Sequence, residues 1–512
     1  MKKNHKIFAN QIKITYLCRV TNRLQKEQTL NLSEMDVLYS MRNGESNRVA
    51  LEEATNIANE VMGLLDAETA TKSGSSRRIA SMTALLNEKE GEEKTKSGSA
   101  NGGGVEIPDT LAYLFNFDDG AGFTIIAADT RIPPILCFTG IGTLDDTNEN
   151  PGVDIFLEGM GYYMERSIAE AEAAKEILLQ ELVDRLEATG VSDTTYLEAD
   201  ESISKVLPLP TLPTQPIGDD IRISYSYGAW TVFERTGPML TVEWGQGEPY
   251  HELVKFKNCI TGVSPTGCTA TAVAQLMSYW SHPASIDGYN FNWSLIRQYT
   301  TTPYRYDGVG TKNIHYANTT SEADLVRGQV ARLMERIGFY ADASYSCDGT
   351  AINVVKSVNF LKNRGYYGGS EMDYSISPVI SSLNIYRPVL ASGYALKTTN
   401  GNTITYSEGH TWVIDGYLRQ SRPVTATTIR TSYQQMSNGM IMMINTTTTN
   451  TYTEISPYYI HNNWGWNGSP NGFFVAGSFD ANYAPTFHSN TKTIGNEGNY
   501  QFINKIYPNI YK

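Results

Sequence analysis

The residue with the clearest chemical potential is Cys268, which stands where a loop meets a helical pattern. Residues 262–280 read G-V-S-P-T-G-C-T-A-T-A-V-A-Q-L-M-S-Y-W. Val273, Leu276 and Met277 recur at helical spacing and predict a buried face that fixes the first turn. A thiol in that turn faces unpaired backbone N–H groups and the positive end of the helix dipole, which favour the reactive thiolate. A cysteine that only packs in a core is the alternative.

A base for such a thiol is available in His410, within the segment S-E-G-H-T-W-V-I-D-G at residues 407–416. Strand alternation would send His410, Trp412 and Ile414 to one face, and the preceding glycine leaves room for close approach. A structural histidine is the alternative. His461 is a rival base, but a hydrogen-bonded surface role explains it equally well, and we prefer His410.

A third segment could orient the histidine. Residues 459–468 read Y-I-H-N-N-W-G-W-N-G. Asn463 could accept the N–H of the far imidazole nitrogen while a tryptophan shields that contact from water, as in thiol peptidases. A tight, aromatic-packed turn is the alternative. The order Cys, His, Asn, with the cysteine opening a helix and the others on later strands, is the papain arrangement.

Two helices are predicted in the N-terminal half. Residues 50–65 carry Ala54, Ile57, Val61 and Leu64 at helical spacing, which predicts an amphipathic helix. Residues 160–188 are rich in Ala, Glu and Leu, and we expect the longest helix of the chain there, followed by a glycine stop.

Between these helices the pattern changes twice. Residues 70–104 contain T-K-S-G-S twice and end in N-G-G-G, so we expect little fixed structure there. Residues 111–117 and 122–128 are apolar or alternating around D-D-G, which predicts a hairpin.

A proline-rich segment divides the chain. Residues 206–220 read V-L-P-L-P-T-L-P-T-Q-P-I-G-D-D, which favours an extended, exposed linker. Tyr-, Thr- and Asn-rich segments of short alternating strands follow it, with one strong helix near their start. A mixed N-terminal unit therefore precedes a larger α+β unit.

Composition excludes some classes of function. The 512-residue chain carries a formal charge of −13, which argues against a nucleic-acid partner. Its five cysteines form no C-x-x-C pair and no recognisable disulfide framework, so those other than Cys268 are expected to pack as small apolar residues. No transmembrane run is present, and the basic N-terminus lacks a normal signal-peptide core.

The three motifs together resemble the streptopain family of bacterial cysteine peptidases. Residues 244–250, W-G-Q-G-E-P-Y, resemble the family's segment ahead of the nucleophile, and residues 115–134 its inhibitory propeptide. The resemblance implies a papain-like catalytic domain at 236–512, an inhibitory propeptide at 45–205 and a processing zone at 206–235. Residues 1–44 have no assigned role.

The resemblance also implies residue roles. Cys268 would be the nucleophile and His410 its base. Trp464 and Trp466 would line the site with Asn463 beside them, and which of the three orients His410 is left open.

Two features depart from the family pattern. Ser392 stands where the family has a glutamine that helps form the oxyanion hole, so this donor is in doubt. Gln246 and the backbone N–H of Cys268 are the other candidates. The stretch from Leu418 to Pro457 is a longer insertion than expected, and could shape substrate access.

The implied activity is that of a zymogen of a cysteine endopeptidase that removes its own propeptide. It needs no cofactor and no metal, and its partners are protein or peptide substrates and its own propeptide as intramolecular inhibitor. The resemblance implies a secreted, cell-surface or periplasmic protein, although no clear signal peptide is visible. A silent scaffold on the same fold and a Cys-His acyl transferase or amidase are the alternatives.

Overall fold

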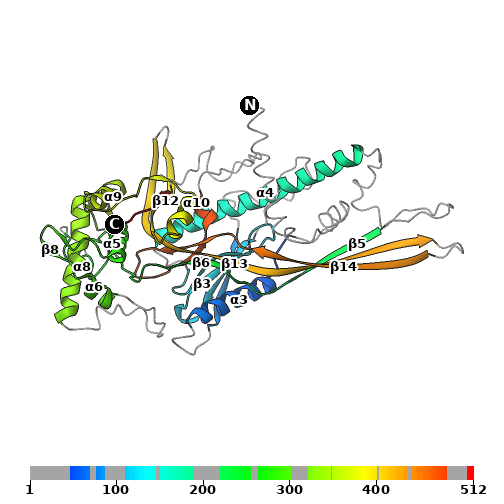
Figure 1. Cartoon of the computed structure of the whole chain (residues 1–512), viewed down its shortest axis with the longest axis horizontal. Helices are drawn as coiled ribbons and strands as arrows, with labels where there is room; N and C mark the ends of the chain where they lie inside the picture. Colours follow the sequence, from blue (N-terminus) through cyan, green and yellow to red (C-terminus); the bar gives the residue numbers. More distant parts are fainter. Residues whose placement is uncertain are drawn as a thin grey trace. The chain divides into compact units, whose positions relative to one another are not determined.

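The structure is a computed structural model, shown in Figure 1. It describes residues 47–69, 77–86, 110–145, 150–188, 219–254, 263–300, 321–347, 349–400, 403–435, 441–480 and 504–512. The chain divides into two compact units, each described here by itself. The larger comprises Arg48–Ser167, Val232–Gln420 and Ser456–Lys512, and the smaller comprises Met1–Asn47, Ile168–Thr231 and Ser421–Ile455.

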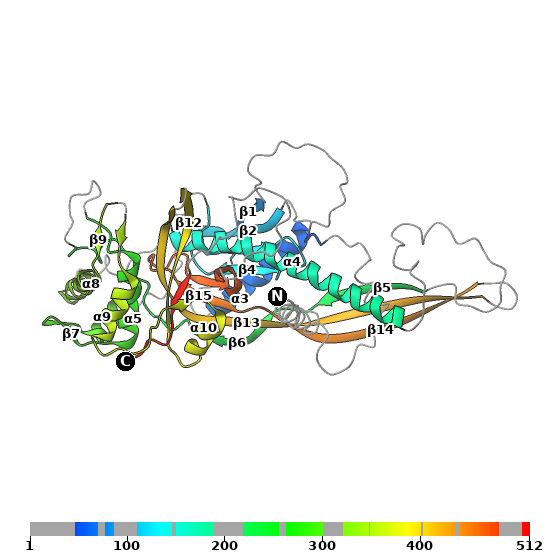
Figure 2. The same ribbon diagram turned by 90° about the horizontal axis from the view of Figure 1, so that it is seen from above.

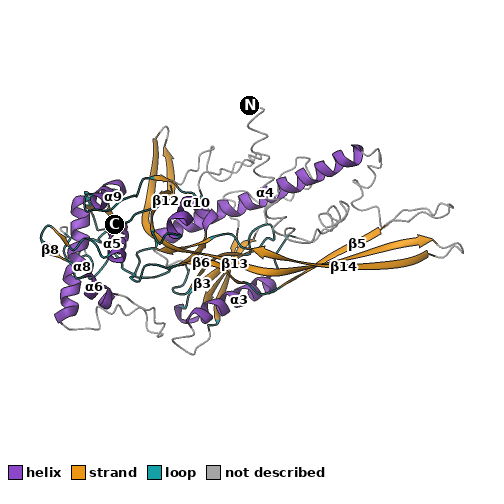
Figure 3. Cartoon of the chain, viewed as in Figure 1, coloured by secondary structure: helices purple, strands orange, loops and turns teal. Residues whose placement is uncertain are grey.

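Helices and strands alternate irregularly along the chain (Figure 3). The helices are α3 (Leu51–Thr69), α4 (Pro151–Ala188), α5 (Cys268–Trp280), α6 (Trp293–Thr300), α8 (Ser321–Tyr340), α9 (Val354–Lys362) and α10 (Ile376–Leu383), with 3-10 turns η1 (Asp118–Gly120) and η3 (Ala476–Phe479). The longer strands are β1 (Ile79–Leu86), β2 (Thr110–Phe117), β3 (Phe123–Ala127), β4 (Ile135–Thr139), β5 (Asp219–Tyr227), β6 (Thr231–Thr236), β12 (Val389–Asn400), β13 (Thr403–Gln435), β14 (Ile441–Ile455), β15 (Tyr459–Asn463) and β16 (Gly472–Val475). The short strands are β7 (Ser285–Ile286), β8 (Tyr289–Asn290), β9 (Ser344–Tyr345), β10 (Thr350–Ala351), β11 (Met372–Asp373) and β17 (Lys505–Tyr507).

One sheet runs through the larger unit in the order β1-β2-β3-β4-β16-β15-β13-β12-β17-β11. Strands β15, β13 and β12 lie side by side at its centre (Figure 2). The sheet joins distant parts of the sequence because β4 pairs antiparallel with β16, placing Phe138 opposite Phe473. The N-terminal strands therefore continue the sheet that carries the motifs at His410 and Asn463.

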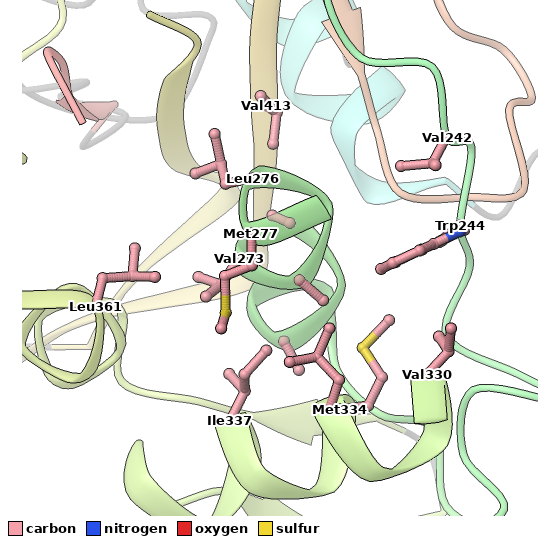
Figure 4. Close-up of a cluster of buried hydrophobic side chains, with 14 of the residues drawn as sticks. Val242, Trp244, Val273, Leu276, Met277, Val330, Met334, Ile337, Leu361 and Val413 are labelled. Atoms are coloured by element: carbon pink, nitrogen blue, oxygen red, sulfur yellow. The ribbon is translucent and has the colours of Figure 1, made fainter. Parts of the chain in front are cut away.

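A second layer of helices surrounds α5. This helix contacts α6, α8 and α9, and its residues Thr269–Ser278 are buried throughout. Figure 4 shows Val273, Leu276 and Met277 among side chains from α8, α9, β13 and the segment around Trp244. The apolar stripe predicted from the sequence is therefore the core that holds this helix.

The N-terminal part of the larger unit confirms most of the predicted elements. The amphipathic helix is α3, whose buried face includes Ala54, Ile57 and Val61 and packs on β3. The predicted hairpin is β2–η1–β3, with Asp119 in the left-handed region at φ 54°.

The expectation of little fixed structure at 70–104 is wrong for part of that segment. Residues 79–86 form β1, which pairs along the length of β2. Its segment I-A-S-M-T-A-L-L alternates, but most of its side chains are exposed at the sheet edge, so the low-complexity repeats around it concealed the pattern. The rest of 70–104 lies outside the described residues, except Arg77 and Arg78.

The longest of the described helices is α4, as predicted, although it begins at Pro151 rather than near Met160. Asn150 caps it, since its Oδ1 accepts the Gly152 N–H at 3.0 Å. Proline suits the first turn of a helix because its missing N–H would have no partner there.

In the smaller unit, the insertion at 418–457 forms a long antiparallel ladder. The second half of β13 pairs with β14 from Ser421↔Ile455 to Gln435↔Ile441, and β5 pairs along the other side. Within the predicted processing zone of 206–235, residues 219–227 and 231–235 are thus strand, and residues 206–218 lie outside the described part. The domain boundaries and the effect of the insertion on substrate access stay predictions.

The cysteines fall into two groups. Cys137 on β4 is buried and free, as expected, and burial raises the pKa of its thiol. Cys347 is disulfide-bonded, so the expectation of a merely packed thiol is wrong there. Cys18 and Cys259 lie outside the described residues. Among the described helices, none is long and apolar enough to cross a membrane.

Candidate active site

Cys268 is the first residue of α5, and the loop before it is tightly constrained. Gly267 has φ +91°, and a Cβ atom there would lie 2.8 Å from the carbonyl oxygen of Thr350. The Thr350 hydroxyl in turn donates to the Pro265 carbonyl at 2.6 Å. Cys268 as a whole residue is half-buried, and it opens a helix whose next ten residues, Thr269 to Ser278, are buried. Position and direction of the sulfur are therefore set by the backbone.

His410 lies on β13 opposite Gly393 of β12 and is only 3% exposed. Its Nε2 is 2.8 Å from the backbone carbonyl oxygen of Trp464. A carbonyl can only accept, so Nε2 carries the proton, and Nδ1 is left for the thiol. The ring centroids of Trp412, Trp464 and Trp466 each lie 6.2 Å from the imidazole and enclose it.

The surroundings of Cys268 favour the thiolate. Burial opposes the charge and is the largest single effect on its pKa. The positive charge of His410, a hydrogen bond with His410, and hydrogen bonds from the backbone and hydroxyl of Thr411 outweigh it. Together they hold the pKa of Cys268 below its ordinary value. Cys268 and His410 are some 140 residues apart in the sequence, but in the structure they interact through a hydrogen bond and through their charges.

Thr411 is a site residue that the sequence analysis did not identify. It is buried, and its hydroxyl accepts a hydrogen bond from the Thr269 hydroxyl at 2.9 Å. This leaves the Thr411 proton free to point to the sulfur. A threonine directly after a candidate base, paired with another directly after the candidate nucleophile, was the available signal.

The side chain of Asn463 forms its hydrogen bonds with residues other than His410. Its Oδ1 accepts from Gln275 Nε2 at 3.1 Å and from the Gly465 N–H at 3.2 Å, and its Nδ2 donates to the Val242 carbonyl at 3.0 Å. Of the three residues left open, the structure brings the backbone of Trp464 to His410. Asn463 supports the turn that follows.

The two predicted oxyanion residues have different surroundings. The backbone carbonyl of Gln246 accepts the Thr266 N–H at 3.0 Å, which ties Gln246 to the loop leading into Cys268. Ser392 lies opposite Thr411 on β12 and hydrogen bonds instead to Tyr507, whose hydroxyl also donates to Glu371 at 2.7 Å. The backbone of Gln246 is thus connected to the loop before Cys268, whereas the Ser392 hydroxyl has another partner.

The rival base, His461, is engaged elsewhere. Its Nδ1 is 2.6 Å from Asp415, a buried carboxylate that also accepts the N–H groups of Met239 and Leu240. Its ring packs edge-on against Phe473. This pairing explains His461 as a structural residue on β15.

The start of α4 lies directly against His410. A Cβ atom at Gly152 would lie 2.2 Å from the Trp464 ring and 2.9 Å from Cδ2 of His410. Asn150 donates to the Ser469 carbonyl at 3.3 Å, which fixes this end of the helix on the turn after β15. The N-terminal part of the chain therefore covers one side of the imidazole.

Comparison with known families assigns both parts of the larger unit. Residues 244–474 match the Peptidase C10 family, and residues 46–164 match the Spi protease inhibitor. The chain thus carries a segment that matches the Peptidase C10 family, preceded by a segment that matches the Spi protease inhibitor. The predicted fold class, an α+β papain-like peptidase domain preceded by a smaller α+β propeptide domain, is confirmed.

Individual relatives of this chain are distant. It is 21% identical to streptopain of Streptococcus pyogenes over 406 residues, covering 75% of this chain and 77% of streptopain. A prointerpain A fragment of Prevotella intermedia aligns with 79% of this chain and 96% of its own, at 16% identity and a TM-score of 0.41. Active interpain A aligns with 48% of this chain and 87% of its own, at 20% identity and a TM-score of 0.29.

Proposed function

We propose that this chain is the zymogen of a cysteine endopeptidase that hydrolyses peptide bonds in proteins. The observation that carries the proposal is the contact of Cys268, at the start of α5, with a histidine whose Nε2–H is held by the Trp464 carbonyl. One ring nitrogen of His410 is thus anchored and the other faces the nucleophile. A thiol peptidase requires a histidine that is held by one ring nitrogen and exchanges protons through the other.

The chemistry follows from these positions. The Cys268 thiolate attacks the scissile carbonyl and forms a C–S bond, and the negative charge moves to the carbonyl oxygen. The N–H of Cys268 at the helix start and the Gln246 side chain are the donors for that oxygen. Protonated His410 gives its proton to the leaving amine as the C–N bond breaks.

Hydrolysis of the acyl-enzyme uses the same histidine. Neutral His410 takes a proton from water, the hydroxide attacks the thioester carbonyl, and the C–S bond breaks to release a carboxylic acid, which then loses its proton to the solvent. The thiolate and the imidazolium are restored, so the cycle consumes only water and the peptide.

Inhibition by the propeptide is supported by the contacts of α4. Gly152 lies against His410 and Trp464, and Phe156 packs on Phe474 and Phe479 of the peptidase domain. A substrate that approaches the imidazole from this side would meet the helix. Release of α4 would then be part of activation.

Export is part of the proposal. The Cys347 disulfide supports it, because disulfides persist in oxidising compartments such as the periplasm and the cell exterior. A secreted, cell-surface or periplasmic enzyme fits both this bond and the implied zymogen.

The test is a peptidyl thiol-reactive probe together with casein hydrolysis, after limited proteolysis of the full-length protein. We expect labelling at Cys268 and casein cleavage, both lost in Cys268→Ala. Labelling at Cys268 without casein cleavage, but with transfer to added amines, would indicate an acyl transferase or amidase. A scaffold that has lost catalysis would show neither labelling nor cleavage.

A further inference from the structure

The backbone of Trp464 is held at both ends. Its carbonyl accepts from His410 Nε2 at 2.8 Å, and its N–H donates to Oδ1 of Asn471 at 3.0 Å. Asn471 is 6% exposed and Trp464 is fully buried. The orientation of the carbonyl that anchors His410 thus depends on the residues that fix this short backbone segment.

The turn between Trp464 and Asn471 contains three residues with positive φ. Gly465, Asn467 and Gly468 have φ values of 69°, 55° and 83°, and the Asn471 N–H donates to the Gly468 carbonyl at 2.8 Å. Glycine adopts such angles readily, but at Asn467 the angle is costly and persists because surrounding contacts enforce it. Side chains beside the turn must supply those contacts.

Glu243 is the side chain that fills the space beside this turn. A Cβ atom at Gly468 would lie 2.5 Å from its Oε2, and its carboxyl group hydrogen bonds to the Asn471 side chain. Since Asn471 Oδ1 accepts from Trp464, its Nδ2 is the donor to Glu243. The side-chain amide of Asn471 therefore bridges Glu243 to the N–H of Trp464, the residue whose carbonyl anchors His410.

Burial and two charged neighbours act on Glu243 within the described part of the chain. Burial raises the pKa of its carboxyl group, the charge of His461 and the Asn471 hydrogen bond oppose this, and the charge of Asp415 adds to it. The carboxyl group is therefore sensitive to any second negative charge placed next to it.

We propose that Asn471, supported by Glu243, is a positioning residue that sets the direction of the Trp464 carbonyl and through it the placement of His410 against Cys268. Its effect on turnover rests on the proposed function, but its effect on the Cys268–His410 pair does not. Nothing in the sequence motif distinguishes Asn471 from an ordinary turn residue, because the bond it makes is to a backbone N–H.

The test measures the rate of Cys268 alkylation by iodoacetamide against pH in the full-length protein, with peptide mapping of the labelled site. Asn471→Leu removes both hydrogen bonds, so we expect the acid limb of the profile to move upward by about one pH unit as the thiolate loses its oriented partner. After limited proteolysis, kcat should fall roughly 10- to 100-fold with little change in KM. Ser469→Ala, in the same turn but without a bond to the Trp464 N–H, should match wild type.

Two variants that change charge distinguish a positioning role of Asn471 from a nonspecific loss of structure. Asn471→Asp can still accept from Trp464, but it places a carboxyl group beside Glu243. The two can share a proton at acid pH and repel when both ionise, so alkylation should be near normal at low pH and fall below wild type as pH rises. Adding Glu243→Gln should remove this pH-dependent loss.

The outcomes are distinct. A folded Asn471→Leu protein, checked by near-UV circular dichroism, with an unchanged alkylation profile would overturn the proposal. If that variant does not fold, an Asn471→Asp loss that Glu243→Gln leaves unaltered would do the same. If Asn471→Leu shifts the alkylation profile but the wild-type protein never cleaves casein, the proposed function would be rejected and the role of Asn471 supported.

Discussion

At the residue scale, the reactivity of Cys268 results from opposing effects. Burial favours the neutral thiol, whereas His410 and the two donors of Thr411 favour the thiolate and prevail. A cysteine pKa below its ordinary value means that the thiolate persists to lower pH. Activity and alkylation should therefore be lost on acidification only as the pH falls through that lowered pKa.

Thr411→Val should raise the pKa of Cys268, because it removes the hydroxyl donor and keeps the shape of the side chain and the backbone N–H. We expect the acid limb of the Cys268 alkylation profile to move to higher pH. Thr411→Ser keeps the hydroxyl and should restore the wild-type limb. Identical profiles for the valine and wild-type proteins would show that the hydroxyl does not stabilise the thiolate.

Gly267→Ala should destabilise the protein and displace the nucleophile, since φ is +91° and the added methyl would meet the Thr350 carbonyl oxygen at 2.8 Å. The expected cost is about 1–3 kcal/mol in the free energy of unfolding, measured by chemical denaturation. Gly247→Ala is the matched control, because an added Cβ there meets nothing within 4 Å. Equal stability of the two variants would contradict this account of the loop.

The sequence predicts the site residues whose side chains do the chemistry. It does not predict the contributions that come from backbone groups. Cys268 and His410 stand in recognisable patterns, and the structure brings them together. The anchor of His410 is the carbonyl of Trp464, which any residue could provide, so the amide of Asn463 was the natural guess. The contribution of Asn471 is hidden for the same reason.

At the element scale, α4 connects the inhibitor-like domain to the active site. Gly152 and Gly159 are seven residues apart and so share one helix face, on which each allows close approach to the peptidase domain. A Cβ atom at Gly159 would lie 1.9 Å from the Ser478 carbonyl oxygen. The sequence pattern did not place the first turns of α4 because Pro151 and Gly152 are typical of turns rather than of helices.

Gly159→Ala should loosen α4 without touching His410, and should speed probe labelling of Cys268 in the unprocessed chain. Gly161→Ala is a matched control on the same helix, where an added Cβ meets nothing within 4 Å. Labelling rates compared by mass spectrometry before any cleavage would decide the matter. Equal rates in both variants would mean that contact along α4 does not keep the enzyme latent.

At the scale of the whole molecule, the inhibitor-like and peptidase domains share one sheet through the pairing of β4 with β16. The stacked rings of Phe138 and Phe473, 5.3 Å apart, reinforce that junction. Their order along the sheet could not be predicted, because strand pairing between residues over 300 positions apart leaves no local pattern. Backbone pairing and α4 together account for a propeptide that would stay bound until the chain is cut.

The pairing of β5 with β13 also bears on where that cut can lie. Residues 219–227 are paired with β13 as β5, and a peptidase binds its substrate as an extended strand without other partners. Cleavage within β5 would first require the ladder to open. We therefore expect the maturation bond to precede Asp219.

The most direct test follows chain length by mass spectrometry while full-length wild type and Cys268→Ala are incubated under mild reducing conditions. We predict that wild type alone converts to a C-terminal product whose first residue lies at or before Asp219. Equal shortening of both proteins would show that Cys268 does not perform the cleavage. An intact wild-type chain that also resists the thiol-reactive probe after limited proteolysis would contradict the assignment of a cysteine peptidase zymogen.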